Sequence, residues 1–204
     1  MSEETGSRYV MLIDLDSCSG CHACSVACKA EHRAPLGQFR TRVQTVLSGS
    51  FPAVRQRFVP TLCQHCVDAP CLKVCPTEAI VRTEEGIVQV DADRCAGTGV
   101  CVPSCPYGAI FLDKRDGIAQ KCDFCEDRLT DGEEPACVAT CPTDALHFGP
   151  TDRADIAQWL ADGKYADQWE RENTQPRVWY RGLDQETKEK LRPIDQVPTG
   201  LSCD

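Results

Sequence analysis

Residues 18–28 read CSGCHACSVAC, so four cysteines follow one another at intervals of two, two and three residues. Such close spacing is typical of thiolates that converge on a metal, whereas disulfide frameworks scatter their cysteines through loops. The chain has 16 cysteines in 204 residues, far above ordinary usage. This run therefore predicts that bound metal, and not a network of disulfides, organises the fold around it.

Three further cysteine groups repeat the motif in altered form. They are Cys63, Cys66, Cys71 and Cys75; Cys95, Cys101 and Cys105; and Cys122, Cys125, Cys137 and Cys141. Each contains a Cys-Pro step within a similar phrase: CPTEAI at 75–80, CPYGAI at 105–110 and CPTDAL at 141–146. Proline has no backbone N–H and ends the helical turn that holds the preceding cysteine. The repetition indicates one duplicated unit and not four unrelated metal loops.

A rule of ligand sharing decides how the groups combine. In two-cluster ferredoxins the run is C-x2-C-x2-C-x3-C-P, and its last cysteine binds the other cluster. The two middle groups are neighbours in sequence and form one pair, which leaves the outer groups as the second pair. The predicted ligands are Cys18, Cys21, Cys24 and Cys141 (site 1); Cys28, Cys122, Cys125 and Cys137 (site 2); Cys63, Cys66, Cys71 and Cys105 (site 3); and Cys75, Cys95 and Cys101 (site 4).

Site 4 lacks one ligand. In CAGTGVCVPSCP, residues 95–106, Thr98 stands where the run requires its second cysteine. We expect [4Fe-4S] clusters at the three complete sites and a [3Fe-4S] cluster at site 4. The alternative at site 4 is a [4Fe-4S] cluster with one iron held by a non-cysteine ligand such as the Thr98 hydroxyl. The remaining Cys203, next to the C-terminal residue, is interpreted as a bystander thiol.

Zinc is the competing interpretation of the same cysteines. Cys63 and Cys66 with Cys122 and Cys125 would make a four-thiolate ribbon, and the protein would then be a zinc-stabilised interaction module. Zinc needs neither runs of four cysteines nor three Cys-Pro endings, whereas shared iron-sulfur clusters need both. We therefore favour clusters, and metal analysis distinguishes the two.

The expected fold class is α+β, with two interleaved bacterial-ferredoxin-like units. Residues 1–38 and 106–150 would form the outer unit, and 63–105 the inner unit. Residues 39–62 have β-branched residues around a Ser-Gly-Ser turn, which predicts an inserted hairpin. Residues 151–204 would form a C-terminal helix over 151–163 and a polar tail that wraps its own domain or a partner.

Shorter elements follow from local patterns. Apolar or alternating runs predict strands at 9–15, 86–91, 109–113 and 145–149, and a short helix at 25–33.

Charge and hydropathy limit the partners. Lys and Arg number 22 against 31 Asp and Glu, a net charge of −9, which argues against a nucleic-acid partner. The first apolar run, residues 9–13, is too short for a signal peptide or a membrane span. We expect a chain that does not cross a membrane and carries no export signal of its own.

The four groups, with the phrases CQHCVDAPCLKVCPTEAI and CPYGAIFLDKRDGIAQKCDFC, resemble the four-cluster electron-transfer subunit of the dimethyl sulfoxide reductase family of molybdopterin oxidoreductases. The similarity covers residues 9 to 150. It implies a non-catalytic subunit that relays electrons between a molybdopterin catalytic subunit and a quinone-linked membrane anchor. Site 1 would lie nearest the catalytic subunit and site 4 nearest the anchor.

The resemblance also bears on site 4 and on location. Some relatives carry Trp at the position of Thr98 and hold a three-iron cluster there. The complex would be membrane-associated, and we favour the periplasmic side through export together with the catalytic subunit.

A different class of function remains open beside this one. The same four sites would suit an autonomous soluble polyferredoxin that shuttles electrons between cytoplasmic enzymes, which would be a stable monomer reduced by a soluble donor. Under either hypothesis we expect no catalytic residues, because no cluster of thiolate, histidine and carboxylate suggests a substrate pocket.

Overall fold

Strand β1 (Tyr9–Asp14) lies at the centre of the largest sheet in the computed structural model, which describes residues 8–197. It pairs antiparallel with β8 (Leu146–Pro150) and parallel with β9 (Val178–Arg181). Its side chains alternate between two hydrophobic clusters, one on each face, which is why the run is apolar without interruption. The strands predicted at 9–15 and 145–149 are confirmed.

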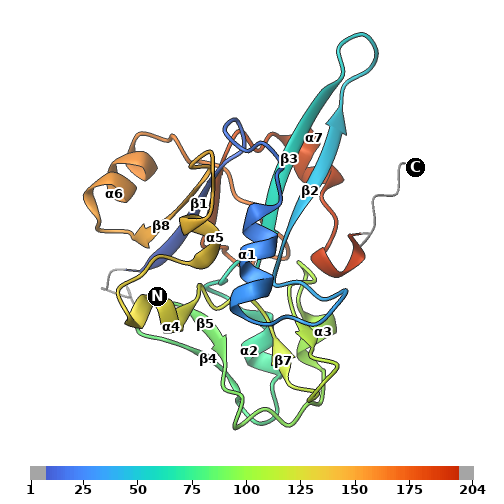
Figure 1. The fold of residues 1–204 in the computed structure, drawn as a ribbon, viewed down its shortest axis with the longest axis vertical. Helices are drawn as coiled ribbons and strands as arrows, with labels where there is room; N and C mark the ends of the chain where they lie inside the picture. The colour runs from blue at the N-terminus through green and yellow to red at the C-terminus, as the bar shows by residue number, and fades with distance from the viewer. Residues whose placement is uncertain (1–7, 198–204) are drawn as a thin grey trace.

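The segment between the first two cysteine groups is the predicted hairpin. Strands β2 (Thr41–Ser48) and β3 (Arg55–Leu62) pair antiparallel along their whole length. Figure 1 shows them rising from the body as an arm. The base of the arm contributes Val43 and Val59 to the core. Phe51, at the tip of the arm, is 91% exposed to solvent.

Four short helices each carry a C-x3-C step or its start. They are α1 (Ala23–Glu31), α2 (Pro70–Val74), α3 (Cys101–Ser104) and α5 (Ala136–Ala139). Helix α1 packs against α5, and α2 packs against α3. The helix predicted at 25–33 is confirmed as α1, which begins two residues earlier than expected.

Two small hairpins follow the first two Cys-Pro steps. The first joins β4 (Ile80–Arg82) to β5 (Val88–Val90), and the second joins β6 (Phe111–Leu112) to β7 (Ala119–Gln120). The strands predicted at 86–91 and 109–113 are therefore present but shorter. Gly86 and Gly117, with φ of 83° and 75°, lie in the turns of these hairpins, so β5 begins later and β6 ends earlier than predicted.

The C-terminal region covers the sheet. Helix α4 (Glu126–Thr130) precedes α5 and β8. The helix predicted at 151–163 is present as α6 (Ala154–Ala161), and its Ile156 packs with Val10 and Leu12. The chain continues through β9, α7 (Gln185–Lys190) and a 3-10 turn (Ile194–Gln196).

The described part of the tail lies on its own domain. Trp169 is buried and meets the Tyr107 ring edge-on, with ring centroids 5.2 Å apart. Leu183 and Ile194 are also buried in the main core. Contact of the tail with a partner stays a prediction, and Cys203 lies outside the described residues.

These elements make a mixed fold of helices and strands, as the sequence predicted. The interleaving of two ferredoxin-like units and the boundaries of those units stay predictions. No helix within residues 8–197 has the length and apolar character to span a bilayer.

Candidate metal-binding sites

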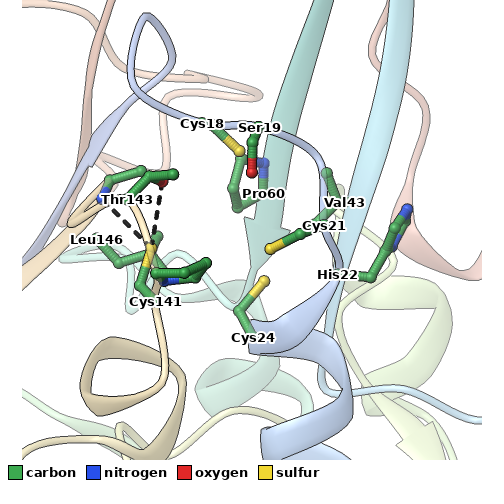
Figure 2. A pocket seen from close by; sticks show the side chains of 12 residues that line it. Cys18, Ser19, Cys21, His22, Cys24, Val43, Pro60, Cys141, Thr143 and Leu146 are labelled. Atoms are coloured by element: carbon green, nitrogen blue, oxygen red, sulfur yellow. Dashed lines mark hydrogen bonds between the residues drawn. The ribbon is translucent and has the colours of Figure 1, made fainter.

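The four cysteines predicted for site 1 line one cavity beneath the hairpin arm (Figure 2). Cys18 and Cys21 come from the loop after β1, Cys24 from α1, and Cys141 from the loop before β8. Val43, Pro60 and Leu146 complete an otherwise apolar lining. His22 also lies at this cavity, but its ring points away from the sulfur atoms in Figure 2. Four thiol sulfurs in an apolar cavity fit the way that proteins hold iron-sulfur clusters.

A second cavity is lined by the cysteines predicted for site 3. Cys63, Cys66 and Cys71 come from the segment after β3, and Cys105 follows α3. Val88 and Tyr107 contribute to its walls. The donor set and the apolar surroundings match those at site 1, so both cavities offer the same chemistry.

The cysteines predicted for site 2 are mutual neighbours at the centre of the molecule. Burial raises the pKa of Cys28 to about 12, Arg40 opposes this rise, and Cys125 adds to it. Burial likewise raises the pKa values of Cys122 and Cys137, and Cys28 raises both further. Without a metal these groups stay neutral thiols. A bound metal cation would deprotonate them and offset the repulsion between the resulting thiolates.

Three cysteines come together at site 4. Burial raises the pKa of Cys101, and the nearby charges of Cys95 and Cys75 add to that rise. Cys75 differs, because hydrogen bonds from the Ile80 and Ala79 N–H groups outweigh its burial and lower its pKa. Two of the predicted groups thus each line a single cavity, and members of the other two groups lie close enough to affect one another's pKa values; the full ligand sets stay predictions.

The ligand loops share one backbone turn. The residue before the second position of each group has a positive φ: Gly20 at 71°, His65 at 44°, Gly97 at 66° and Phe124 at 57°. Non-glycine residues adopt this conformation at a cost, and such strained positions are enriched at ligand-binding sites. At Gly20 a Cβ would lie 2.4 Å from the Phe58 ring, so glycine is also required by packing.

This repeated turn defines the position of Thr98. Gly97 corresponds to Gly20, and Gly99, with φ of 73°, corresponds to His22, with φ of 61°. Thr98 therefore occupies the backbone position that Cys21 has at site 1. Its side chain is exposed, and so is Cys21.

The Cys-Pro steps give each sulfur a backbone donor. The Ala79 N–H donates to Cys75 Sγ at 3.2 Å, and the Ala145 N–H donates to Cys141 Sγ at 3.3 Å, as marked in Figure 2. The Ala109 N–H acts in the same way on Cys105 and opposes the rise that burial causes in its pKa. Donors of this kind favour the thiolate over the thiol.

The sequence analysis did not identify two side chains that lie next to the sites, His32 and Lys121. His32 Nε2 lies 3.2 Å from Cys125 Sγ and 3.8 Å from Asp123 Oδ1, and Arg40 Nη1 binds the other Asp123 oxygen at 2.5 Å. The four-residue step from Cys28 to His32, which continues the face of α1, is the signal that would have found this histidine. Lys121, buried beside Cys122, has no comparable local signal.

Comparisons with known proteins support iron-sulfur binding by this chain. A family model described as a 4Fe-4S dicluster domain matches residues 54–151. The thiosulfate reductase electron transfer subunit PhsB of Salmonella typhi is 48% identical over 157 residues, 76% of this chain and 82% of the relative. A tetrathionate reductase subunit of Salmonella typhimurium is 43% identical over 184 residues, 87% and 73% of the two chains. A putative iron-sulfur subunit of dimethyl sulfoxide reductase from Halobacterium salinarum is 35% identical over 206 residues, 85% and 79% of the two chains.

Proposed function

Because the chain belongs to the family of iron-sulfur electron-transfer subunits of reductase complexes, we propose that it relays electrons through four iron-sulfur clusters. The clusters supply one-electron redox chemistry when bound, and the chain itself holds them and sets their spacing and environment. The electrons pass between a molybdopterin-containing catalytic subunit and a quinone-linked membrane anchor subunit. Sites 1 to 3 would hold [4Fe-4S] clusters, and site 4 a [3Fe-4S] cluster.

The crosswise grouping of cysteines carries this proposal. Cys141 shares a cavity with Cys18, Cys21 and Cys24, although α2 to α5 lie between them in the chain. Cys105 completes the cavity of Cys63 and Cys66 in the same way. A zinc ribbon would instead need Cys122 and Cys125 in that cavity, and they do not line it. Ligand sharing of this kind is what paired clusters require.

The helices suggest the order of the sites along a path. Helix α1 carries Cys24 of site 1 and Cys28 of site 2, four residues or about 6 Å apart along its axis. Cys71 in α2 and Cys75 at its end link sites 3 and 4 in the same manner. Cys122 lies close enough to Cys63 for its pKa to be affected, which joins sites 2 and 3. These links support an electron path through sites 1, 2, 3 and 4 in that order.

The ends of this path reach the surface. Cys21 of site 1 is exposed, and Val26 on the neighbouring helix α1 is 66% exposed. At site 4, Thr98 is exposed and is flanked by the exposed Val100. The cysteines of site 2 are buried. Electrons would therefore enter and leave at sites 1 and 4.

We assign the catalytic subunit to the surface over site 1 and the anchor to the surface over site 4, in a complex on the periplasmic side of the membrane. Trp169 in the tail lies in the core of its own chain and gives no argument for a partner. The partner surfaces therefore rest on the exposed ends of the path and on the relatives.

Metal content tests the proposal. Chain purified without oxygen should contain about 15 iron atoms, from three sites of four and one of three, with matching acid-labile sulfide. A value near eight, or zinc in place of iron, would refute the four-site arrangement. Native purification distinguishes the partner-bound subunit from an autonomous polyferredoxin, since the first co-purifies with a molybdenum-containing protein and the second is a monomer.

A further inference from the structure

Lys121 is a buried cation without a buried anion bound to it. Its residue is only 2% exposed, and its Nζ donates to two carbonyl oxygens, those of Val88 and, at 2.9 Å, of Cys122. Among residues 8–197 no carboxylate forms an ion pair with it. A buried charge is costly unless an opposite charge compensates it. Carbonyl groups solvate the ammonium. Burial would raise the pKa of the nearby Asp123 carboxylate, which pairs with Arg40, but Arg40, His32 and Lys121 together lower it. One carboxylate is thus shared among three basic groups, so further negative charge beside Lys121 would be stabilised.

The position of Lys121 indicates the source of that charge. It directly precedes Cys122, a ligand of site 2. Val88, whose carbonyl accepts from Lys121 Nζ, lines the site 3 cavity together with Cys71 and Cys105. In agreement with this position, the Lys121 ammonium opposes the rise that burial causes in the pKa values of both cysteines. Cys71 and Cys105 belong to site 3. Lys121 thus lies between the ligands of the two inner sites.

Neighbouring groups fix the ammonium at this junction. The Val88 carbonyl accepts from Lys121, and the Val88 N–H donates to His65 Nδ1 at 3.1 Å. The His65 ring stacks on Phe124, with centroids 3.6 Å apart. His65 belongs to the ligand loop of site 3 and Phe124 to that of site 2, so the two loops are packed face to face. The charge is therefore preorganised and does not depend on a mobile surface side chain.

We propose that Lys121 is a positioning residue that sets redox potential: its fixed charge raises the reduction potentials of the clusters at sites 2 and 3, most strongly at site 3. Reduction adds a negative charge to a cluster, and a nearby cation in a low-dielectric interior stabilises that added charge. The inner pair then accepts an electron from either end of the path more readily. This inference rests on the proposed function, since only bound clusters have potentials.

The test is Lys121→Met, which replaces the side chain by an unbranched one that is one heavy atom shorter and has no charge. In the anaerobically purified complex, paramagnetic resonance followed through a redox titration gives the potential of each cluster. We expect the reduction equilibrium at site 3 to shift at least tenfold towards the oxidised form, which is about 59 mV for a one-electron couple. Site 2 should shift less, and sites 1 and 4 should be unchanged.

Lys73→Met is the matched control. Lys73 lies in α2 between the ligands Cys71 and Cys75, but its side chain is 65% exposed and pairs with Asp68 at 2.5 Å. Water and salt screen such a charge, so its loss should leave all four potentials in place. A shift in Lys73→Met as large as that in Lys121→Met would contradict a special role of the buried charge.

Each remaining outcome is informative. A fully loaded Lys121→Met protein with four unshifted potentials would overturn the inference. If Lys121→Met loses iron while Lys121→Arg keeps both the iron and the native potentials, the positive charge is required and the inference is supported. Loss of iron in both variants would assign Lys121 to folding alone. Failure of the proposed function is seen separately, as a native chain without four clusters.

Discussion

Replacing Thr98 by cysteine tests the assignment of site 4. The turn formed by Gly97 and Gly99 repeats the turn of Gly20 and His22 around Cys21. A cysteine at position 98 would therefore start from the same backbone geometry as Cys21 and add a fourth thiolate to Cys75, Cys95 and Cys101. We expect the iron content to rise from about 15 to about 16 atoms, because a fourth iron gains a ligand.

The added charge sets the size of the change in potential. One negative charge at about 4 Å interacts with a second charge by about 1 kcal/mol in water and by about 4 kcal/mol near a protein surface. For a one-electron couple about 1.4 kcal/mol corresponds to 59 mV, so the potential of site 4 should fall by roughly 40 to 170 mV. Thr98 is exposed, which favours the lower part of that range.

The assay is paramagnetic resonance of mildly oxidised protein. The native protein should show a three-iron signal of about one spin per chain, and Thr98→Cys should lose it. Thr98→Ser is the control, since it keeps a hydroxyl and should keep the signal. A native protein with about 16 iron atoms and no three-iron signal would refute the reasoning and make Thr98 or solvent the ligand of a fourth iron.

Three other changes have defined outcomes. Cys141→Ser should damage the cluster of Cys18, Cys21 and Cys24, and a resonance change confined to site 2 would show that the sharing is wrong. His32→Leu removes the contact of the ring with Cys125 Sγ, and a hydrogen bond to sulfur strengthens when the cluster gains negative charge. A redox titration should therefore find the potential of site 2 lower, by at most about 60 mV if a bond worth about 1.5 kcal/mol acted on the reduced state alone, with no change as the contrary result. Asp184→Ala removes the cap in which Asp184 Oδ1 accepts from the Thr187 N–H at 2.8 Å, and should lower the free energy of unfolding by about 1 kcal/mol. Because bonds from Thr187 depress the Asp184 pKa, the cap is complete above the ordinary aspartate pKa and is lost only as pH falls through the lower folded value. Unfolding measured at pH 8 and at pH 5 should therefore show the same difference, and a difference that shrinks by pH 5 would contradict this.

Local patterns predicted what depends on local geometry. The hairpin at 39–62 and helix α6 were predicted because their periodicity and turn residues lie within a few positions of one another. The C-x3-C steps were equally informative, since residues four apart share one face of a helix. These features needed no knowledge of distant contacts.

Distant contacts account for what was missed. Strand β9 has only four residues, VWYR, which is too few for a clear alternation within a polar segment. Its partner β1 lies near the other end of the chain, so no local pattern indicates their pairing. Lys121 reads as an ordinary surface lysine, because its burial depends on Val88 and on the packing of His65 against Phe124. Sequence reasoning grouped the cysteines, but it did not find the side chains that the fold brings against them.

The central position of β1 has a consequence for biosynthesis. A ribosome delivers this strand early, but both of its neighbours, β8 and β9, arrive only after nearly all the cysteine groups have emerged. Cys18, Cys21 and Cys24 likewise wait for Cys141, whereas Cys63, Cys66 and Cys71 need only Cys105. Metal loading can therefore begin in the middle of the nascent chain and finish at its outer site. The pairing of β9 with β1, which completes the sheet, then follows the last predicted ligand in the order of synthesis.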